Sequence, residues 1–121
     1  MLVELKDVKQ NDDEDFRRWF ADDYFDLIVW YDRNKNISGF QLCYNKEEDE
    51  RSLTWKKNIG FSHNKIDDGD RPGQAKMTPV LVPDGTFAKH PVADKFKEKS
   101  KEIDSDTADF VYKTILLYPG K

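Results

Sequence analysis

Alternation of apolar and polar positions dominates the middle of the chain. Between residues 24 and 66, four apolar runs are separated by short polar turns, and they read YFDLIVWYD, ISGFQLCYN, RSLTWKK and GFSHNKI. Their content of β-branched and aromatic residues predicts strands. Turns as short as RNKN and KEEDE join only antiparallel neighbours, because parallel strands need long crossover connections. The pattern therefore predicts an antiparallel meander over residues 24–66.

The two-residue period of a strand assigns these side chains to two faces. One face is predicted to carry the apolar residues Phe40, Leu42, Tyr44, Leu53, Trp55, Ile59 and Phe61, together with His63. The opposite face is largely polar in the last three runs. In the first run Ile28 and Trp30 oppose the apolar set, so this strand is a candidate for cover on both faces.

The C-terminal third has helical patterns. Pro91 suits the first turn of a helix whose thin apolar stripe ends near Ile103, and a second helix is expected from Asp104 or Ser105 up to Pro119-Gly120. KMTPVLV, residues 76–82, is a candidate fifth strand. The predicted fold class is α+β, with a four- to five-stranded antiparallel meander sheet and two C-terminal helices packed on one face.

The N-terminal segment has a mixed pattern. LVEL at residues 2–5 favours an edge strand, whereas NDDEDFRRWF at residues 11–20 favours a short helix. Acidic residues crowd the first turn of this expected helix, and Phe16, Trp19 and Phe20 have i, i+3, i+4 spacing.

Length and composition limit the class of protein. A chain of 121 residues is expected to form a single domain, residues 1–121. The net charge of −4 disfavours a nucleic-acid partner, because phosphate binding needs a positive surface. MLVELKDVKQ has no apolar core of a signal peptide, and no run has membrane-spanning length. We therefore expect a cytoplasmic protein without a membrane partner. A single cysteine excludes an internal disulfide.

GFSHNKIDDGDRPG, residues 60–73, is the segment best suited to chemistry. His63, Asp67, Asp68 and Asp70 are candidate metal ligands or acid–base groups, and Arg71 is a candidate for holding an anionic group. The spacing matches no specific metal motif, so no cofactor or metal identity follows from it. The structural interpretation is favoured over the catalytic one: His63 completes the apolar face of the sheet, while the aspartates solvate a turn.

Two other residue pairs in the sequence suggest catalytic sites that strand geometry disfavours. Ser62 and His63 are adjacent in a strand and point to opposite faces, so they do not form a nucleophile–base pair. Cys43 is predicted on the more polar face, one strand removed from His63, and a half-buried structural thiol is expected there.

A calcium-loop spacing also occurs within a predicted hairpin. Asp32, Asn34 and Asn36 have this spacing, but Ile37 and Cys43 stand where such a loop needs glycine and glutamate. We therefore interpret the segment as a hairpin turn.

Aromatic residues make up 13% of the chain, more than a core of this size needs. If Ile28 and Trp30 lie on an uncovered sheet face, they form an apolar patch of the kind that marks an interface. Cover by the N-terminal segment is the alternative. The first functional interpretation is a non-catalytic binding, accessory or self-associating module, with a second copy or another protein as partner. The second is an enzyme or small-ligand binder, metal-dependent or acid–base, centred on His63 and the Asp67–Arg71 loop.

Several segments resemble one group of known sequences. At RRWFADDYFDLIVWYD, GFQLCYN, LTW, GFSH, IDDG and TPVLVPDGTF, the chain is similar to small bacterial proteins described only as hypothetical. The likeness covers most of residues 17–87. It implies a bacterial cytosolic source, and it implies no activity and no functional residue.

Overall fold

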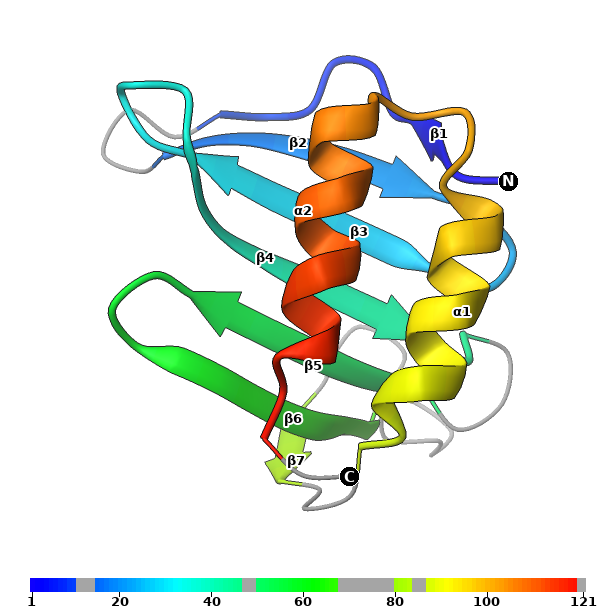
Figure 1. The fold of residues 1–121 in the computed structure, drawn as a ribbon. Coiled ribbons are helices and arrows are strands. Elements are labelled where there is room, and N and C mark those ends of the chain that lie inside the picture. The colour runs from blue at the N-terminus through cyan, green and yellow to red at the C-terminus, as the bar shows by residue number, and fades with distance from the viewer. Residues whose placement is uncertain (11–14, 47–49, 68–79, 84–86, 120–121) are drawn as a thin grey trace, which may run out of the picture.

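Figure 1 shows a layer of strands covered on one side by two helices in the computed structural model of the chain. The structure describes residues 1–10, 15–46, 50–67, 80–83 and 87–119. The strands are β1 (Val3–Glu4), β2 (Phe16–Ala21), β3 (Asp26–Tyr31), β4 (Ile37–Tyr44), β5 (Arg51–Lys56), β6 (Gly60–Asp67) and β7 (Val80–Pro83). The helices are α1 (Lys89–Lys99) and α2 (Ser105–Leu116).

The strands form one antiparallel sheet in which each pairs with its neighbour in sequence. Within the described residues the order is β1-β2-β3-β4-β5-β6-β7. The meander predicted over residues 24–66 is confirmed as β3 to β6, and the edge strand predicted at residues 2–5 is confirmed as β1. The candidate fifth strand at residues 76–82 is β7 in its described part, and the expected count of four to five strands was too low because β1 and β2 precede the meander.

The helix predicted at residues 11–20 is wrong where the structure describes it. Phe16–Ala21 is strand β2, which pairs along its whole length with β3. The i, i+3, i+4 spacing of Phe16, Trp19 and Phe20 also fits a strand that has one buried aromatic on its inner face. Phe20 is fully buried opposite Leu27. Pairing with the edge of β3 supplies the backbone hydrogen bonds, so tertiary context overrides the local helical pattern.

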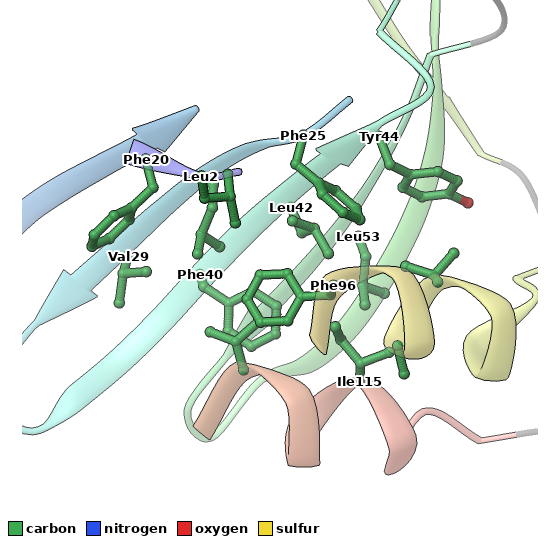
Figure 2. Packing of buried hydrophobic residues seen from close by; sticks show 14 of the residues in the cluster. Leu2, Phe20, Phe25, Val29, Phe40, Leu42, Tyr44, Leu53, Phe96 and Ile115 are labelled. Carbon is green, nitrogen blue, oxygen red and sulfur yellow. The ribbon is translucent and has the colours of Figure 1, made fainter. Parts of the chain in front are cut away.

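The core lies between the sheet and the helices, as the two-residue period predicts. Figure 2 shows Phe20, Phe25, Val29, Phe40, Leu42 and Leu53 extending from the sheet side toward Phe96 and Ile115 of the helices. Leu27, Val29, Phe40, Leu42 and Leu53 are fully buried. The face predicted to be apolar is therefore the face that the helices cover, except at Ile59, which lies in the β5–β6 turn and is 81% exposed.

The start of α2 is confirmed at the predicted position. Asp104 is its N-cap, and the Asp104 carboxylate accepts a hydrogen bond from the Thr107 backbone N–H. Such a cap satisfies one of the backbone donors that the first turn leaves without a partner. Pro91 lies in the first turn of α1, as expected. Neither helix has the length and apolar character needed to cross a membrane, and the structure describes no other helix.

The two helices together are not wide enough to cover the full length of the strands. β4 has 8 residues and therefore extends roughly 27 Å, at ~3.4 Å per residue. Two helices packed side by side cover roughly 20 Å. In Figure 1 the helices cross the strands, and the β3–β4 and β5–β6 turns extend beyond α2. The end of the sheet near these turns is left without a helix above it.

Candidate functional site

His63 lies inside an aromatic cluster on the covered face of β6. Its ring is 5% exposed, and its Nε2 lies 2.6 Å from the Tyr44 hydroxyl oxygen. The Phe87 and Tyr118 ring centroids are 4.9 and 6.4 Å from the centroid of His63. A hydrogen-bonded, buried imidazole of this kind stabilises a core. The structural interpretation of His63 therefore fits its surroundings.

The acidic residues of the predicted His63 site lie outside the described part of the structure. Asp67 ends β6, but its side chain lies outside the described part of the structure, as do Asp68, Asp70 and Arg71 entirely. The catalytic or metal-binding centre at these residues stays a prediction. Within the described residues, no group of three or more His, Cys, Asp or Glu side chains is arranged to hold a metal ion.

Cys43 lies on the face opposite to His63. It pairs with Ser52 across β4 and β5, whereas His63 pairs with Leu53 on the covered face. Burial, and after it the charges of the nearby Glu50 and Asp26 carboxylates, together raise the pKa of the Cys43 thiol to about 12. A thiol with such a pKa is almost entirely protonated near neutral pH and is a poor nucleophile. The expectation of a half-buried thiol is confirmed.

The Asp32–Asn36 segment is a hairpin turn, as expected. The Asp32 Oδ1 atom accepts hydrogen bonds from the backbone N–H groups of Asn34 and Asn36. The same carboxylate oxygen that a calcium loop would direct at an ion is thus used to close the turn. The resemblance to a calcium loop is accidental.

A groove runs along α2 at the uncovered end of the sheet. Its volume is about 810 Å³. Tyr31, Ile37, Trp55 and Phe61 of the sheet line it, and α2 contributes the stripe Thr107, Phe110, Thr114 and Leu117. These α2 positions recur every three to four residues, so they form one side of the helix. The groove is a direct consequence of strands that are longer than the helix layer is wide.

Apolar side chains in the groove are only partly covered by the protein itself. Trp55, Phe61, Phe110, Ile37 and Tyr31 are half-buried and pack against the core from its edge. Leu117 is 73% exposed. The Trp55 and Phe110 rings contact each other with centroids 5.4 Å apart, and this contact joins the sheet to the helix. Concave apolar surface with this degree of exposure is typical of a binding site.

One end of the groove is polar and firmly held. Arg18 of β2 donates hydrogen bonds to both Glu4 oxygens at 2.9 and 2.7 Å, and its Nη2 lies 3.0 Å from the Asp104 carboxylate. Arg18 also donates to the Tyr31 hydroxyl, which lies 2.7 Å from the Thr107 Oγ1. These contacts join β1, β2 and β3 to the first turn of α2. They fix the polar end of the groove in one geometry.

The electrostatics of this end follow from the same contacts. The hydrogen bond from Arg18 lowers the pKa of Glu4, and the hydrogen bond to Glu4 raises the pKa of Arg18. Burial alone would raise the pKa of Asp104. Hydrogen bonds from Thr107 and the charge of Arg18 outweigh burial, so the pKa of Asp104 is lowered. All three groups are charged near neutral pH and are engaged with one another.

The rim of the groove that faces away from α2, formed by the β3–β4 and β5–β6 turns, carries two lysines. Lys35 lies in the β3–β4 turn and Lys57 in the β5–β6 turn, and both are exposed. In the described part of the chain, neither lysine has an ion pair. A second hollow of about 480 Å³ continues from this rim and is lined by Phe16, Arg18, Tyr31, Asp32 and Lys35. Phe16 is 55% exposed there.

The face away from the helices carries Ile28 and Trp30, as the alternation predicts. Both are half-buried. Lys56 lies over the Trp30 ring, with its Nζ 5.4 Å from the ring centroid, and Ser38 donates a hydrogen bond to Asp15 nearby. Charged and polar groups thus border this tryptophan. Four aromatic side chains line the groove along α2, whereas the hollow beside Trp30 has this one aromatic residue, so the groove is the better candidate site.

No family model, curated protein or solved structure matches the chain. The similarity to small bacterial proteins therefore stays a prediction, and the geometry of the molecule is the basis for a functional proposal.

Sequence reasoning recognised the aromatic surplus but not the groove. The sequence pattern assigns Ala108, Val111, Tyr112, Ile115 and Leu116 to the buried face of the last helix, and Phe110 and Leu117 fall outside this set. Arg18 falls within the predicted helix that does not form. The signal in the sequence is Leu117, a large apolar residue just beyond the predicted buried face.

Proposed function

We propose that the protein is a non-catalytic binding module that holds an amphipathic helix of a partner protein in the groove along α2. The observation that carries this proposal is the half-buried aromatic lining of the groove, formed by Trp55, Phe61 and Phe110, with the exposed Leu117 at its end. An additional helix at this position would complete the layer that α1 and α2 begin.

The dimensions of the groove favour a helical occupant. The stripe from Thr107 to Leu117 covers eleven residues, so its two ends are about 15 Å apart at ~1.5 Å rise per residue. The uncovered end of the sheet is roughly one helix wide, because packed helices lie ~8–10 Å apart. A helix of about three turns would pack against α2 on one side and against the ends of β3 to β6 below. This is the helix-in-groove mode of recognition, in which an apolar stripe is the anchor.

The groove's ionisable groups support binding rather than catalysis. Arg18, Glu4 and Asp104 are paired with one another, and Tyr31 is hydrogen-bonded to Thr107. A general acid or base needs a hydrogen-bonding position open to a substrate. These groups instead hold β1, β2 and α2 in place beside the apolar floor.

A separate protein is favoured over a second copy as the occupant. The outward faces of both described helices are charged: α1 presents Asp94, Lys95, Lys97 and Glu98, and α2 presents Asp106, Asp109 and Lys113. Their apolar stripes are already buried against the sheet of the same chain. Among the described elements, a second copy therefore offers no amphipathic helix to the groove.

Trp55 fluorescence tests the proposal directly. The probe is a synthetic peptide of about fourteen residues with leucines at helical i, i+3, i+7 and i+10 positions and mixed charges elsewhere. We expect a saturable change of the tryptophan spectrum, lost in Trp55→Phe and retained in Trp30→Phe. Leu117→Asp should weaken binding by roughly tenfold or more, because it places a charge where an apolar contact forms. Since Leu117 is mostly exposed, this variant is expected to fold.

Two results would contradict the helix-binding function. One is a peptide response that a scrambled, non-amphipathic peptide reproduces equally. The other is concentration-dependent association of the protein itself that Leu117→Asp abolishes, which would identify a second copy as the occupant. Sedimentation velocity at several protein concentrations distinguishes this case from binding of the peptide.

A further inference from the structure

We infer that the partner helix carries acidic residues along the flank that faces the β3–β4 and β5–β6 turns. This inference rests on the proposed function, because it describes the chemistry of the helix in the same groove. It follows from the unequal distribution of charge on the two rims. The turn rim carries Lys35 and Lys57, whereas the α2 rim carries Asp104 and Asp106 at its N-terminal end.

The two lysines are held on structured turns. The Lys35 backbone N–H donates to the Asp32 carbonyl oxygen at 3.0 Å, within the turn that the Asp32 side chain closes. The Lys57 backbone N–H donates to the Ser38 carbonyl oxygen at 2.9 Å, which joins its turn to β4. Both Cα positions are thus set by the sheet. An ion pair with either lysine would restrict side-chain rotamers but would not require the backbone to become ordered.

The other charged groups at the groove do not cancel these lysines. Arg18 is balanced by Glu4 and Asp104. Asp32 keeps its negative charge at the base of the turn, where its Oδ1 accepts hydrogen bonds from two backbone N–H groups, and the exposed Arg33 of the same turn offsets that charge. Asp106 lies at the far end, in the first turn of α2. The outer rim is therefore a local basic strip beside an apolar floor.

The positive charge of this strip is opposite in sign to the net charge of the whole chain. The chain has a net charge of −4, so an acidic partner would be repelled by most of the protein at long range. Lys35 and Lys57, which have no ion pair within the described residues, would direct the approach and select which flank of the helix faces the turns. Complementary rim charges act mainly on specificity and on the association rate.

The test compares two peptides that share the leucine stripe of the groove probe. One has glutamates on the flank expected to face the turns, and the other has lysines at the same positions. We expect the glutamate peptide to bind about tenfold more tightly than the lysine peptide at low salt, because the two rim lysines attract glutamates and repel lysines at these positions. The preference should shrink at high salt because exposed charges are screened.

Charge reversal in the protein completes the test. In Lys35→Glu/Lys57→Glu the preference should invert, so that the lysine peptide binds more tightly. The matched control Lys97→Glu/Lys101→Glu changes the net charge by the same amount. Both lysines are exposed, and they lie beside α1 and the α1–α2 connection rather than at the groove. Its preference should remain that of the wild type. Circular dichroism of both double variants confirms that the fold is retained.

The outcomes separate this inference from the function on which it rests. Equal binding of both peptides, with the response still lost in Trp55→Phe, would overturn the acidic preference and leave the groove function standing. Absence of any Trp55 response to either peptide would overturn both. If Lys97→Glu/Lys101→Glu removed the preference for the glutamate peptide as fully as Lys35→Glu/Lys57→Glu, the preference would come from net charge. This result would also overturn the inference.

Discussion

The hydroxyl oxygen of Tyr31 lies 2.7 Å from the Oγ1 atom of Thr107, and this hydrogen bond joins β3 to the first turn of α2. The two residues are 76 positions apart in the chain. Thr107 is almost fully buried, and Arg18 donates to the same Tyr31 hydroxyl. The contact therefore fixes the helix at the polar end of the groove.

Tyr31→Phe should destabilise the protein modestly. The substitution keeps the ring but leaves the buried Thr107 hydroxyl without this partner, and a lost hydrogen bond of this kind costs about 0.5–1.5 kcal/mol. Urea denaturation followed by circular dichroism measures the loss. Tyr112→Phe is the matched control, because Tyr112 is half-buried on α2 and its hydroxyl makes no hydrogen bond to any residue that the structure describes. Equal destabilisation by the two substitutions would show that the Tyr31–Thr107 contact has no particular role.

The stabilising effect of Arg18 should depend on pH. Glu4 and Asp104 have lowered pKa values in the folded protein, Glu4 chiefly through its hydrogen bond from Arg18. A carboxyl with a lowered folded pKa contributes stability above its unfolded pKa, and this contribution is lost as pH falls through the folded value. The stability difference between wild type and Arg18→Met should therefore be present near pH 6 and shrink below about pH 4.

The urea unfolding midpoints of wild type and Arg18→Met, measured across this pH range, test the prediction. Lys113→Met removes an exposed ion pair with Asp109 and serves as the control, because pairs of this kind contribute little to stability. Its effect should be small at every pH. A difference between wild type and Arg18→Met that stays constant from neutral to acid pH would contradict the assignment.

Ile115→Ala should be strongly destabilising. Ile115 is fully buried on α2, and truncating such a residue costs about 2–5 kcal/mol through lost apolar contact and a cavity. Lys97→Ala, on the exposed side of α1, should change stability by no more than about 0.5 kcal/mol. Phe61→Ala should lie between them, since Phe61 is half-buried at the groove rather than central in the core. Similar thermal midpoints for all three variants would place the core on the wrong face.

The Cys43 thiol should react slowly in the native protein. Burial and, to a smaller extent, the charges of Glu50 and Asp26 together raise its pKa to about 12. The thiolate fraction near pH 8 is then on the order of a thousandfold below that of an ordinary cysteine. Reaction with a disulfide reagent such as dithionitrobenzoate should be slow in buffer and fast in urea. Rapid labelling of the native protein, at the rate seen for the unfolded chain, would be inconsistent with a buried thiol.

The sequence by itself determined the meander, its inner face and the start of α2. Each of these depends on local physics: alternation places Phe40 and Leu42 on one side of β4, short turns enforce antiparallel pairing, and Asp104 caps the helix that follows it. These features need no knowledge of distant residues. Their prediction from the residues was therefore reliable.

Tertiary structure alone decided the identity of β2, the surroundings of His63 and the groove. β2 is a strand because β3 offers it an edge, which the local pattern of Phe16–Ala21 does not contain. His63 is buried because Tyr44, Phe87 and Tyr118 come from distant segments to surround it. The groove exists because two helices cover less length than the strands beneath them. Each of these outcomes depends on how elements meet, and a residue's own neighbours in sequence do not specify that.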